Sequence, residues 1–458
     1  MHPWMTITAK DLDIELAQCI DEGKDVEPLR AEFARLQQAD LERDPKLRQQ
    51  ACRLVDKSLR LPVRKDFPFK EPSRLSAIQR ARKGRTRLPS DLPSPQVLLD
   101  KAHGAWTGRC CGCLLGKPVE GRTRAEIRNY LQAQNAWPLD FYFSNEAIEQ
   151  DRLDNHFPDH ANPCYRENIT CMVEDDDTNY TVAGLALMSL HGLEFKPQDV
   201  GDFWLQNMPI YHLCTAERVA YRNLVGLIPA PQPDGRVAGR FSCATFRNPY
   251  REWIGAMIRG DFFGYACPAE PQWAAELAWR DACISHVKNG IYGEMWVSAM
   301  LAAAYVLEDA PTVIQAGLGE IPAACRLHRD ISDVLDWRRQ GRTYEEAIDA
   351  IHARWREDFS HHWCHTNSNA QIVAAALLYG ERDYARTICL AVMSGFDTDC
   401  NAATAGSVLG LMLGQKALPA LWADPIRDTL LTGVQGYYQV RLEDLAAQTV
   451  ALIEKLHR

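Results

Sequence analysis

The hydrophobic positions from residue 97 onward recur mainly with the period of an α-helix, in Ala- and Leu-rich runs separated by short polar connections. The alternation of β-branched and polar residues that is typical of strands is nearly absent. Two longer polar stretches, Pro138–Thr170 and Pro229–Phe241, are predicted to be irregular. The sequence therefore predicts an all-α fold with one large helical domain over residues 97–458. Its predicted helices include Leu98–Cys113, Val182–Leu193, Trp273–Cys283, Met295–Leu307, Ile372–Tyr379, Ala385–Met393 and Ala402–Leu413.

The first ninety residues have a different character. They contain 19 Lys and Arg against 14 Asp and Glu, whereas the whole chain has a net charge of −9. Short charged helices are predicted over Asp11–Glu22, Val26–Ala39 and Pro45–Ser58, and Pro89, Pro93 and Pro95 mark a linker. We therefore expect a small basic helical N-terminal extension at residues 1–90, a Pro-rich linker at 91–96 and the main domain at 97–458. Because the extension holds none of the motifs described below, we expect it to be dispensable for chemistry.

The overall composition narrows the class of protein. A chain of 458 residues that is 46% hydrophobic can bury a sizeable core. The negative net charge argues against general binding of nucleic acid, and no apolar run approaches the ~20 residues of a membrane span. The N-terminus lacks a secretory pattern, and the fifteen cysteines have no framework spacing. We expect a cytoplasmic protein with reduced thiols and no membrane or nucleic-acid partner; the sequence leaves its oligomeric state open.

Two acidic clusters, Glu174–Thr178 and Gly395–Asn401, each come directly before an apolar helical run. One Asp at a helix start is ordinary capping, and either cluster alone is more often a capped, solvated helix start. Consecutive carboxylates repel one another unless a cation compensates, and hard divalent cations prefer oxygen ligands. The apolar and Gly-rich flanks favour this second interpretation. If the two helix ends meet, one or two ions of Mg²⁺, Mn²⁺ or Ca²⁺ would be held by Asp175, Asp176, Asp177, Asp397 and Asp399.

Two further segments combine glycine with polar residues. Gly112–Glu120 ends a predicted helix in a glycine-spaced turn that delivers Glu120, although Gly-x-x-x-Gly usually reflects close helix packing. Ser285–Glu294 lies between two apolar helices and has the composition to contact hydroxyls or phosphates of a ligand. A plain helix–helix connection with His286 as a cap is an equally good interpretation of that segment.

A zinc site is an alternative use of other residues. Cys110 and Cys113 have C-x-x-C spacing, and His361 and His365 have H-x-x-x-H spacing. The two cysteines, however, lie on an apolar helical stretch, where buried free cysteine is common. The sequence contains no phosphate-binding P-loop, no Gly-x-Ser-x-Gly elbow and no complete dinucleotide fingerprint.

The acidic clusters, the Glu120 segment and the Ser285–Glu294 segment follow one another in an order that resembles the ADP-ribosylglycohydrolase family, which includes the dinitrogenase-reductase-activating glycohydrolases. The resemblance covers roughly residues 97–415. Its strongest element is Asp397-Thr398-Asp399 followed by Asn401–Ser407, and the next is Asp176-Asp177-Thr178. Together these motifs are far more specific than either alone.

The resemblance implies an all-α domain whose central cleft holds two divalent ions, usually Mg²⁺. The family's aspartate ligands match Asp176, Asp177, Asp397 and Asp399, with Asp175 beside them, and its catalytic glutamate matches Glu120. We expect Asp177 and Asp399 to take part in catalysis together with Glu120. Substrate contacts are expected from His286, Asn289, Gly290, Gly395 and Asn401.

The chain departs from the family pattern at three positions, which indicates a divergent subfamily. Asp175 and Cys400 stand where many members have a threonine ligand, and Cys113 stands where many have an aspartate. A thiol is a poor ligand for a hard cation, so one of the two ion sites is expected to be weaker, altered or filled by water.

The expected function is metal-dependent cleavage of the anomeric bond of an ADP-ribosyl or related ribosyl group, on a small molecule or a protein. Two alternatives stay open: an N-glycosidase for a small ribosylated metabolite or nucleoside, and a non-catalytic protein that binds ADP-ribose. Whether Glu120 acts as a general base or as a proton shuttle is also left open.

Overall fold

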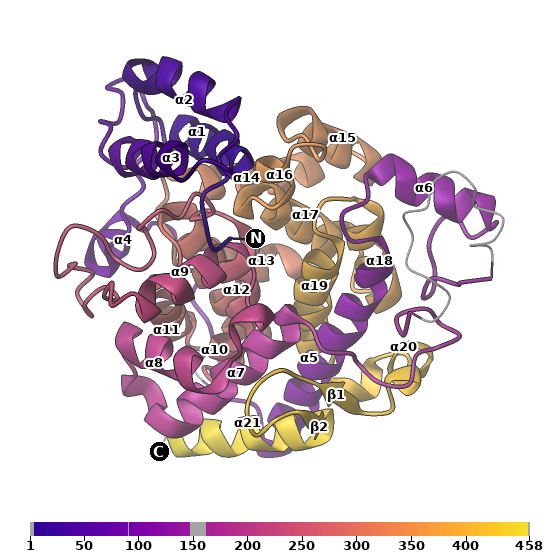
Figure 1. The fold of residues 1–458 in the computed structure, drawn as a ribbon. Coiled ribbons are helices and arrows are strands. Elements are labelled where there is room, and N and C mark those ends of the chain that lie inside the picture. The colour runs from indigo at the N-terminus through magenta and orange to yellow at the C-terminus, as the bar shows by residue number, and fades with distance from the viewer. Residues whose placement is uncertain (1–3, 90, 147–161, 457–458) are drawn as a thin grey trace.

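The computed structural model describes residues 4–89, 91–146 and 162–456, and almost all of its regular structure is helical (Figure 1). Within those ranges one small antiparallel ribbon is present, in which β1 (Thr429–Leu431) pairs with β2 (Gln439–Arg441). The prediction of an all-α fold is therefore confirmed.

The seven helices predicted for the main domain all overlap observed helices. They are α5 (Pro95–Gly116), α7 (Asp176–His191), α11 (Pro271–Ala282), α12 (Lys288–Ala304), α17 (Thr366–Tyr379), α18 (Tyr384–Met393) and α19 (Thr398–Leu413). Shorter or more polar helices surround them: α6 (Arg124–Ala133), α8 (Pro197–Asn207), α9 (Thr215–Val225), α10 (Asp261–Tyr265), α13 (Ala310–Leu318), α14 (Arg326–Arg339), α15 (Tyr344–Arg354), α16 (Ser360–Trp363), α20 (Ala420–Ala423) and α21 (Leu442–Leu456).

Helices α5 and α19 form the centre of the molecule and run antiparallel in direct backbone contact. One face of α5 carries Gly104, Gly108, Gly112 and Gly116, each four residues from the next. Any Cβ atom on this face would collide with the backbone of α19, from Gly410 opposite Gly104 to Asp399 opposite Gly116. Because glycine has no side chain, the two helices approach closely, and the start of α19 is fixed beside the end of α5.

The N-terminal segment, residues 4–89, forms α1 (Ala9–Asp21), α2 (Arg30–Gln37), α3 (Pro45–Ser58) and α4 (Leu75–Ala81). Its first three helices enclose a small core of their own, which includes Phe33 and Leu54. The segment is tied to the rest of the chain by Arg251, whose buried guanidinium pairs with Glu15 at 2.6 Å and Glu22 at 2.8 Å. Figure 1 shows α1, in indigo, near α16, with which it is in contact.

The polar stretches follow the prediction where they are described. Residues 229–241 contain no helix or strand. The stretch Pro138–Thr170 is likewise without helix or strand at its two ends, and its middle, residues 147–161, lies outside the described residues. All fifteen cysteines lie in the described ranges and are unpaired. No helix in those ranges has the length and apolar character that crossing a membrane requires.

Candidate active site

The two predicted acidic clusters meet at the helix pair α5–α19. Asp175 caps α7 and accepts a hydrogen bond from the backbone N–H of Asp177 at 2.9 Å. Asp397 precedes α19, where Gly395 and Phe396 both adopt positive φ and turn the chain into the helix. Candidate ligand atoms lie within 4.8 Å of one another in two groups: Cys113, Asp175, Asp177 and Asp399, and then Asp397, Asp399 and Cys400. Asp399 belongs to both groups and joins them.

The carboxylates in this cluster disturb one another strongly. Burial raises the pKa of Asp176 to about 8, with further contributions from Asp175 and Asp399. Burial and the charge of Asp175 also raise the pKa of Asp399. Asp175 is the exception: burial raises the pKa of its carboxyl, but the ammonium of Lys117 and the hydrogen bonds that the carboxylate accepts together lower that pKa below its ordinary value. Lys117 at Asp175 and Arg109 at Asp177 do not neutralise the whole cluster, so a further cation is needed to keep all of the acids ionised together.

Arg109 holds the carboxylate of Asp177 in position. It is fully buried on α5, donates to the Asp177 carboxylate at 3.0 Å and pairs with Asp261 at 2.9 Å. The other oxygen of Asp177, Oδ2, and Oδ1 of Asp399 are buried without a hydrogen-bond partner among the described residues. Unpaired buried oxygens are costly, and a bound divalent cation would satisfy them. The residues present therefore fit a hard metal ion.

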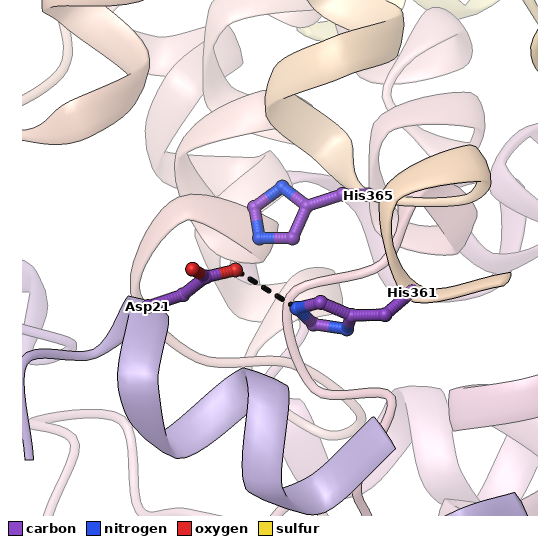
Figure 2. A group of neighbouring side chains, drawn as sticks. All are labelled: Asp21, His361 and His365. Carbon is purple, nitrogen blue, oxygen red and sulfur yellow. Dashed lines mark hydrogen bonds and ion pairs between the residues drawn. The ribbon is translucent and has the colours of Figure 1, made fainter. Parts of the chain in front are cut away.

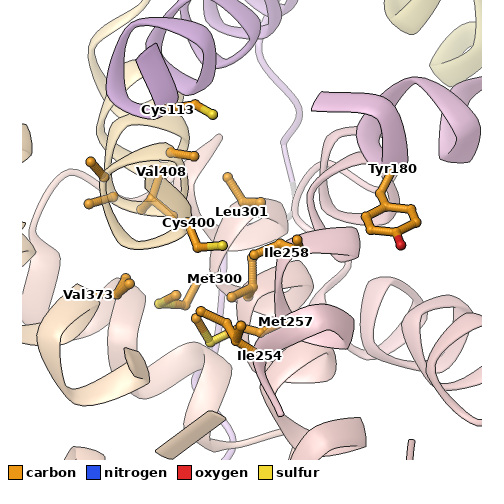
Figure 3. Close-up of a cluster of buried hydrophobic side chains, with 14 of the residues drawn as sticks. Cys113, Tyr180, Ile254, Met257, Ile258, Met300, Leu301, Val373, Cys400 and Val408 are labelled. Carbon is orange, nitrogen blue, oxygen red and sulfur yellow. The ribbon is translucent and has the colours of Figure 1, made fainter. Parts of the chain in front are cut away.

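The two cysteines of the cluster border it from the apolar side. Figure 3 shows Cys113 and Cys400 among buried hydrophobic side chains, with Met257 and Ile258 nearby. Burial and the charge of Asp177 raise the pKa of the Cys400 thiol, which favours the neutral form. A neutral thiol is a weak ligand for a hard cation, so the oxygen atoms carry the metal-binding capacity.

A cavity of about 290 Å³ opens beside the acidic cluster. Glu120, directly after the short 3₁₀ turn Lys117–Val119, exposes its side chain there, and the nearby Asp399 carboxylate raises its pKa. Asp176, Asp397 and Asp399 also line the cavity. Trp4, Lys10, Asp11 and Ile14 of the N-terminal segment line the same cavity. This placement argues against the expectation that the extension is dispensable for chemistry.

Three of the predicted substrate contacts, His286, Asn289 and Gly290, are not part of the cavity lining. His286 is buried, with Nδ1 2.8 Å from the Ser285 hydroxyl. The Asn289 amide donates to Glu71 at 2.8 Å and to Glu252 at 2.9 Å, and a Cβ on Gly290 would lie 2.8 Å from the carbonyl oxygen of Arg251. These residues make internal contacts here, and their contact with substrate stays a prediction.

Gly395 and Asn401 belong to the second acidic cluster but are not part of the cavity lining. They support the backbone at the start of α19. Gly395 has φ of 76°, a conformation that glycine adopts without strain. The Asn401 amide donates to the side-chain oxygen of Asn369 at 2.8 Å. Asn369 in turn accepts from the backbone N–H of Asp397 at 3.2 Å, so the pair holds the start of α19.

Sequence reasoning missed several site residues. Arg109 and Lys117 carried a usable signal, because a charged residue inside an apolar helix or a Gly-rich motif needs a partner. Glu217 lines the cavity, and burial raises its pKa to about 7. No local pattern distinguishes Glu217 or Trp4, since their positions depend on packing between distant segments.

The structure does not assemble the zinc alternative. In the described part of the chain, Cys113 joins the aspartates, whereas His361 and His365 cluster with Asp21 of α1 (Figure 2). His361 Nδ1 accepts from the Trp253 indole at 3.1 Å, and its Nε2 lies 2.9 Å from the Asp21 carboxylate. His365 Nδ1 accepts from the backbone N–H of Asn367 at 3.0 Å.

These bonds determine where each imidazole carries its proton. With Nδ1 accepting, a neutral ring has its hydrogen on Nε2, the nitrogen that faces Asp21. A metal ligand needs the reverse arrangement, in which the other nitrogen donates to an acceptor. His361 is therefore suited to hydrogen bonding with Asp21, whereas Nε2 of His365 is buried without a hydrogen-bond partner among the described residues. Neither imidazole has the proton arrangement of a metal ligand.

Comparison with known proteins gives one family match. The sequence model of the ADP-ribosylglycohydrolase family matches residues 94–457. A solved structure described as an ADP-ribosylglycohydrolase-related protein complex is 18% identical, covering 79% of this chain and 99% of the other, with a TM-score of 0.47. No curated protein matches the chain. The family match includes both acidic clusters and Glu120, and it begins after the N-terminal segment.

Proposed function

Because the chain belongs to the ADP-ribosylglycohydrolase family, we propose that it is a metal-dependent glycohydrolase that cleaves the anomeric bond of an ADP-ribosyl or related ribosyl group. The family supports glycosidic hydrolysis. The metal dependence, the identity of the ion, for which Mg²⁺ is the first candidate, and the residue roles are our proposal.

One observation carries the proposal: carboxylates from two distant helix starts converge beside a cavity, with two buried oxygens unpaired. The convergence is built from Asp175 and Asp177 on one side and Asp397 and Asp399 on the other. A protein that merely binds ADP-ribose has no need for such a costly concentration of buried charge. The intact acids therefore favour the enzyme over the non-catalytic binder.

Hydrolysis of a ribosyl bond passes through an oxocarbenium-like transition state. A divalent ion held by these aspartates would supply positive charge for the ribose hydroxyls and would acidify a water molecule. Glu120 reaches the cavity, where it either takes the proton of the attacking water or passes a proton to the leaving group. Arg109 and Lys117 act as positioning residues, because they fix Asp177 and Asp175.

The test is hydrolysis of ADP-ribosyl-arginine, ADP-ribosyl-serine and simple ribonucleosides by the full chain, in Mg²⁺, Mn²⁺, Ca²⁺ or EDTA. Glu120→Gln should retain metal binding, measured by calorimetry, and lose about 10²–10⁴-fold in turnover. Asp399→Ala should lose metal binding as well, because Asp399 belongs to both ligand groups. Asp176→Ala and Asp397→Ala should be nearly as severe, since each mainly disturbs one ion.

Hydrolysis that is unaffected by EDTA and by Glu120→Gln would refute the proposed mechanism. Binding of ADP-ribose without hydrolysis of any of these compounds would favour the non-catalytic alternative.

A further inference from the structure

One part of the cavity wall belongs to a stretch of the chain that the family match does not cover. Trp4, Lys10, Asp11 and Ile14 line the cavity, and the match begins at residue 94. Asp11 accepts a hydrogen bond from the hydroxyl of Tyr250, which also lines the cavity. The N-terminal segment thus adds a surface to the site that the family's matched region does not provide.

Buried ion pairs anchor this part of the cavity wall to the main domain. Arg251, which pairs with Glu15 and Glu22, is buried with both partners, and removing one member of such a buried pair is strongly destabilising. Asp21, the last residue of α1, lies with its carboxylate 2.9 Å from Nε2 of His361, as Figure 2 shows.

The residues before α1 are held as well. The Arg222 guanidinium donates to the carbonyl oxygen of Met5 at 3.2 Å, and that of Arg218 lies 4.6 Å from the ring centre of Trp4. The cavity-lining residues of the N-terminal segment are therefore held by contacts both before α1 and at its end.

The cavity also has a distinct chemistry. Four aromatic side chains line it, namely Trp4, Tyr250, Trp253 and Trp363, and aromatic rings of this kind stack on a nucleobase. Six acids share the lining: Asp11, Glu120, Asp176, Glu217, Asp397 and Asp399. Among the described lining residues Lys10 is the single Lys or Arg, and no arginine is present to bind a phosphate.

The size of the cavity and the charge of its lining favour the same class of substrate. A cavity of about 290 Å³ is at the lower limit of small-molecule sites, which span about 300–1,000 Å³. ADP-ribose is a nucleoside extended by a diphosphate and a second ribose, so it needs more space and brings negative charge towards the acids. A nucleoside brings one ribose for the acidic cluster and one base for the aromatic rings.

We infer that the N-terminal segment makes this enzyme selective for small ribosyl compounds of the nucleoside class, with a neutral or cationic base, over ADP-ribosyl groups on proteins. The inference rests on the proposed function. The reaction breaks the bond between the anomeric carbon and the base nitrogen, and the hydroxyl of water goes to that carbon. The remaining proton goes to the departing nitrogen, or to solvent when a cationic base leaves in its neutral form.

The experiment compares kcat/KM of the full chain, with Mg²⁺ or Mn²⁺, for adenosine, uridine, nicotinamide riboside, ADP-ribosyl-arginine and an ADP-ribosylated protein. At least one nucleoside should be cleaved with a kcat/KM at least tenfold above both ADP-ribosyl substrates. Trp4→Ala should lower the nucleoside value about tenfold, mainly through KM, because it removes one stacking surface. Asp11→Asn should reduce the difference in kcat/KM between nucleosides and ADP-ribosyl substrates, because it removes a negative charge from the cavity wall.

The matched control is Trp273→Ala, which removes a tryptophan that is 43% exposed and lies outside the cavity lining, and which should change neither class. Calorimetry on Glu120→Gln with adenosine and with ADP-ribose gives a second measurement that does not depend on turnover. Circular dichroism confirms that each variant is folded.

The outcomes separate the two proposals. Faster cleavage of ADP-ribosyl-arginine or of the ADP-ribosylated protein would overturn the selectivity and leave the proposed function intact. If no ribosyl compound is cleaved, the proposed function fails, and calorimetry still decides the selectivity. Tighter binding of ADP-ribose than of adenosine would overturn it, whereas the reverse order would support it.

Discussion

Gly116→Ala is the most direct test of how the fold builds the site. A Cβ atom at Gly116 would lie under 3.0 Å from the backbone of Asp399, and ordinary contact begins at 3.4 Å. The obstructing atoms are backbone, so no flexible side chain can give way. The end of α5 and the start of α19 must therefore separate, by about 0.5–1 Å, which exceeds the tolerance of a preorganised site.

Two effects of this substitution on stability oppose each other. Alanine favours a helix over glycine by about 1 kcal/mol, whereas overpacking a tight contact costs about 1–3 kcal/mol. We therefore expect a small loss in the free energy of unfolding, up to about 2 kcal/mol. The larger effect is on the metal site, because displacing Asp399 disturbs both ligand groups. Disturbed support of a ligand typically costs about 10–100-fold in metal affinity.

The assay is calorimetric titration with Mn²⁺, together with urea unfolding of the metal-free protein. Gly104→Ala is the matched control, because its Cβ would also meet backbone atoms, with Gln415 N at 2.7 Å. It lies on the same face of α5, about three helical turns away from the acids. Both variants should be destabilised, and only Gly116→Ala should lose metal affinity. Equal Mn²⁺ affinity in the two variants, or wild-type affinity in Gly116→Ala, would refute the reasoning.

Three further outcomes are expected. Saturating Mg²⁺ or Mn²⁺ should raise the melting temperature above that in EDTA, since an ion at a hundred times its Kd adds about 2.7 kcal/mol of stability; identical melts in all conditions would argue against a metal site. Cys400→Thr should be tolerated and should tighten metal binding, because it replaces a thiol with a harder oxygen ligand; calorimetry that shows weaker binding would contradict this. Asp21→Asn should cost stability above about pH 4, and the cost should shrink as the pH falls further. Burial opposes the charge of Asp21, but the hydrogen bond from His361 and the neighbouring His361, His365 and Arg326 side chains together lower the pKa of that carboxyl in the folded state. The stability that this lowered pKa provides is present above the pKa of Asp21 in the unfolded chain, and it is lost as the pH falls through the pKa in the folded protein. A difference in melting temperature between Asp21→Asn and the wild type that does not change with pH would count against this account.

The sequence was sufficient for features that depend on neighbouring residues. Long Ala- and Leu-rich runs without strand-like alternation predicted α5, α7, α12 and α19, because a helix that is buried on every side is apolar all round. The surplus of acids at two helix starts was also visible, since capping uses a single side chain. Even the glycine spacing of α5 indicated close helix packing. Each of these inferences concerns one segment and the energetic preferences of its own residues.

Only the tertiary structure decided which segments meet. The sequence did not indicate that Trp4 and Asp11 would face Asp399, because residues almost four hundred positions apart come together only through the packing of the whole chain. The same holds for Asp21, which clusters with His361 and His365 in place of the two cysteines that the zinc alternative requires. Local preferences determine helices, whereas the site is determined by burial, by buried ion pairs such as Arg251 with Glu15, and by the close approach that glycine allows between α5 and α19.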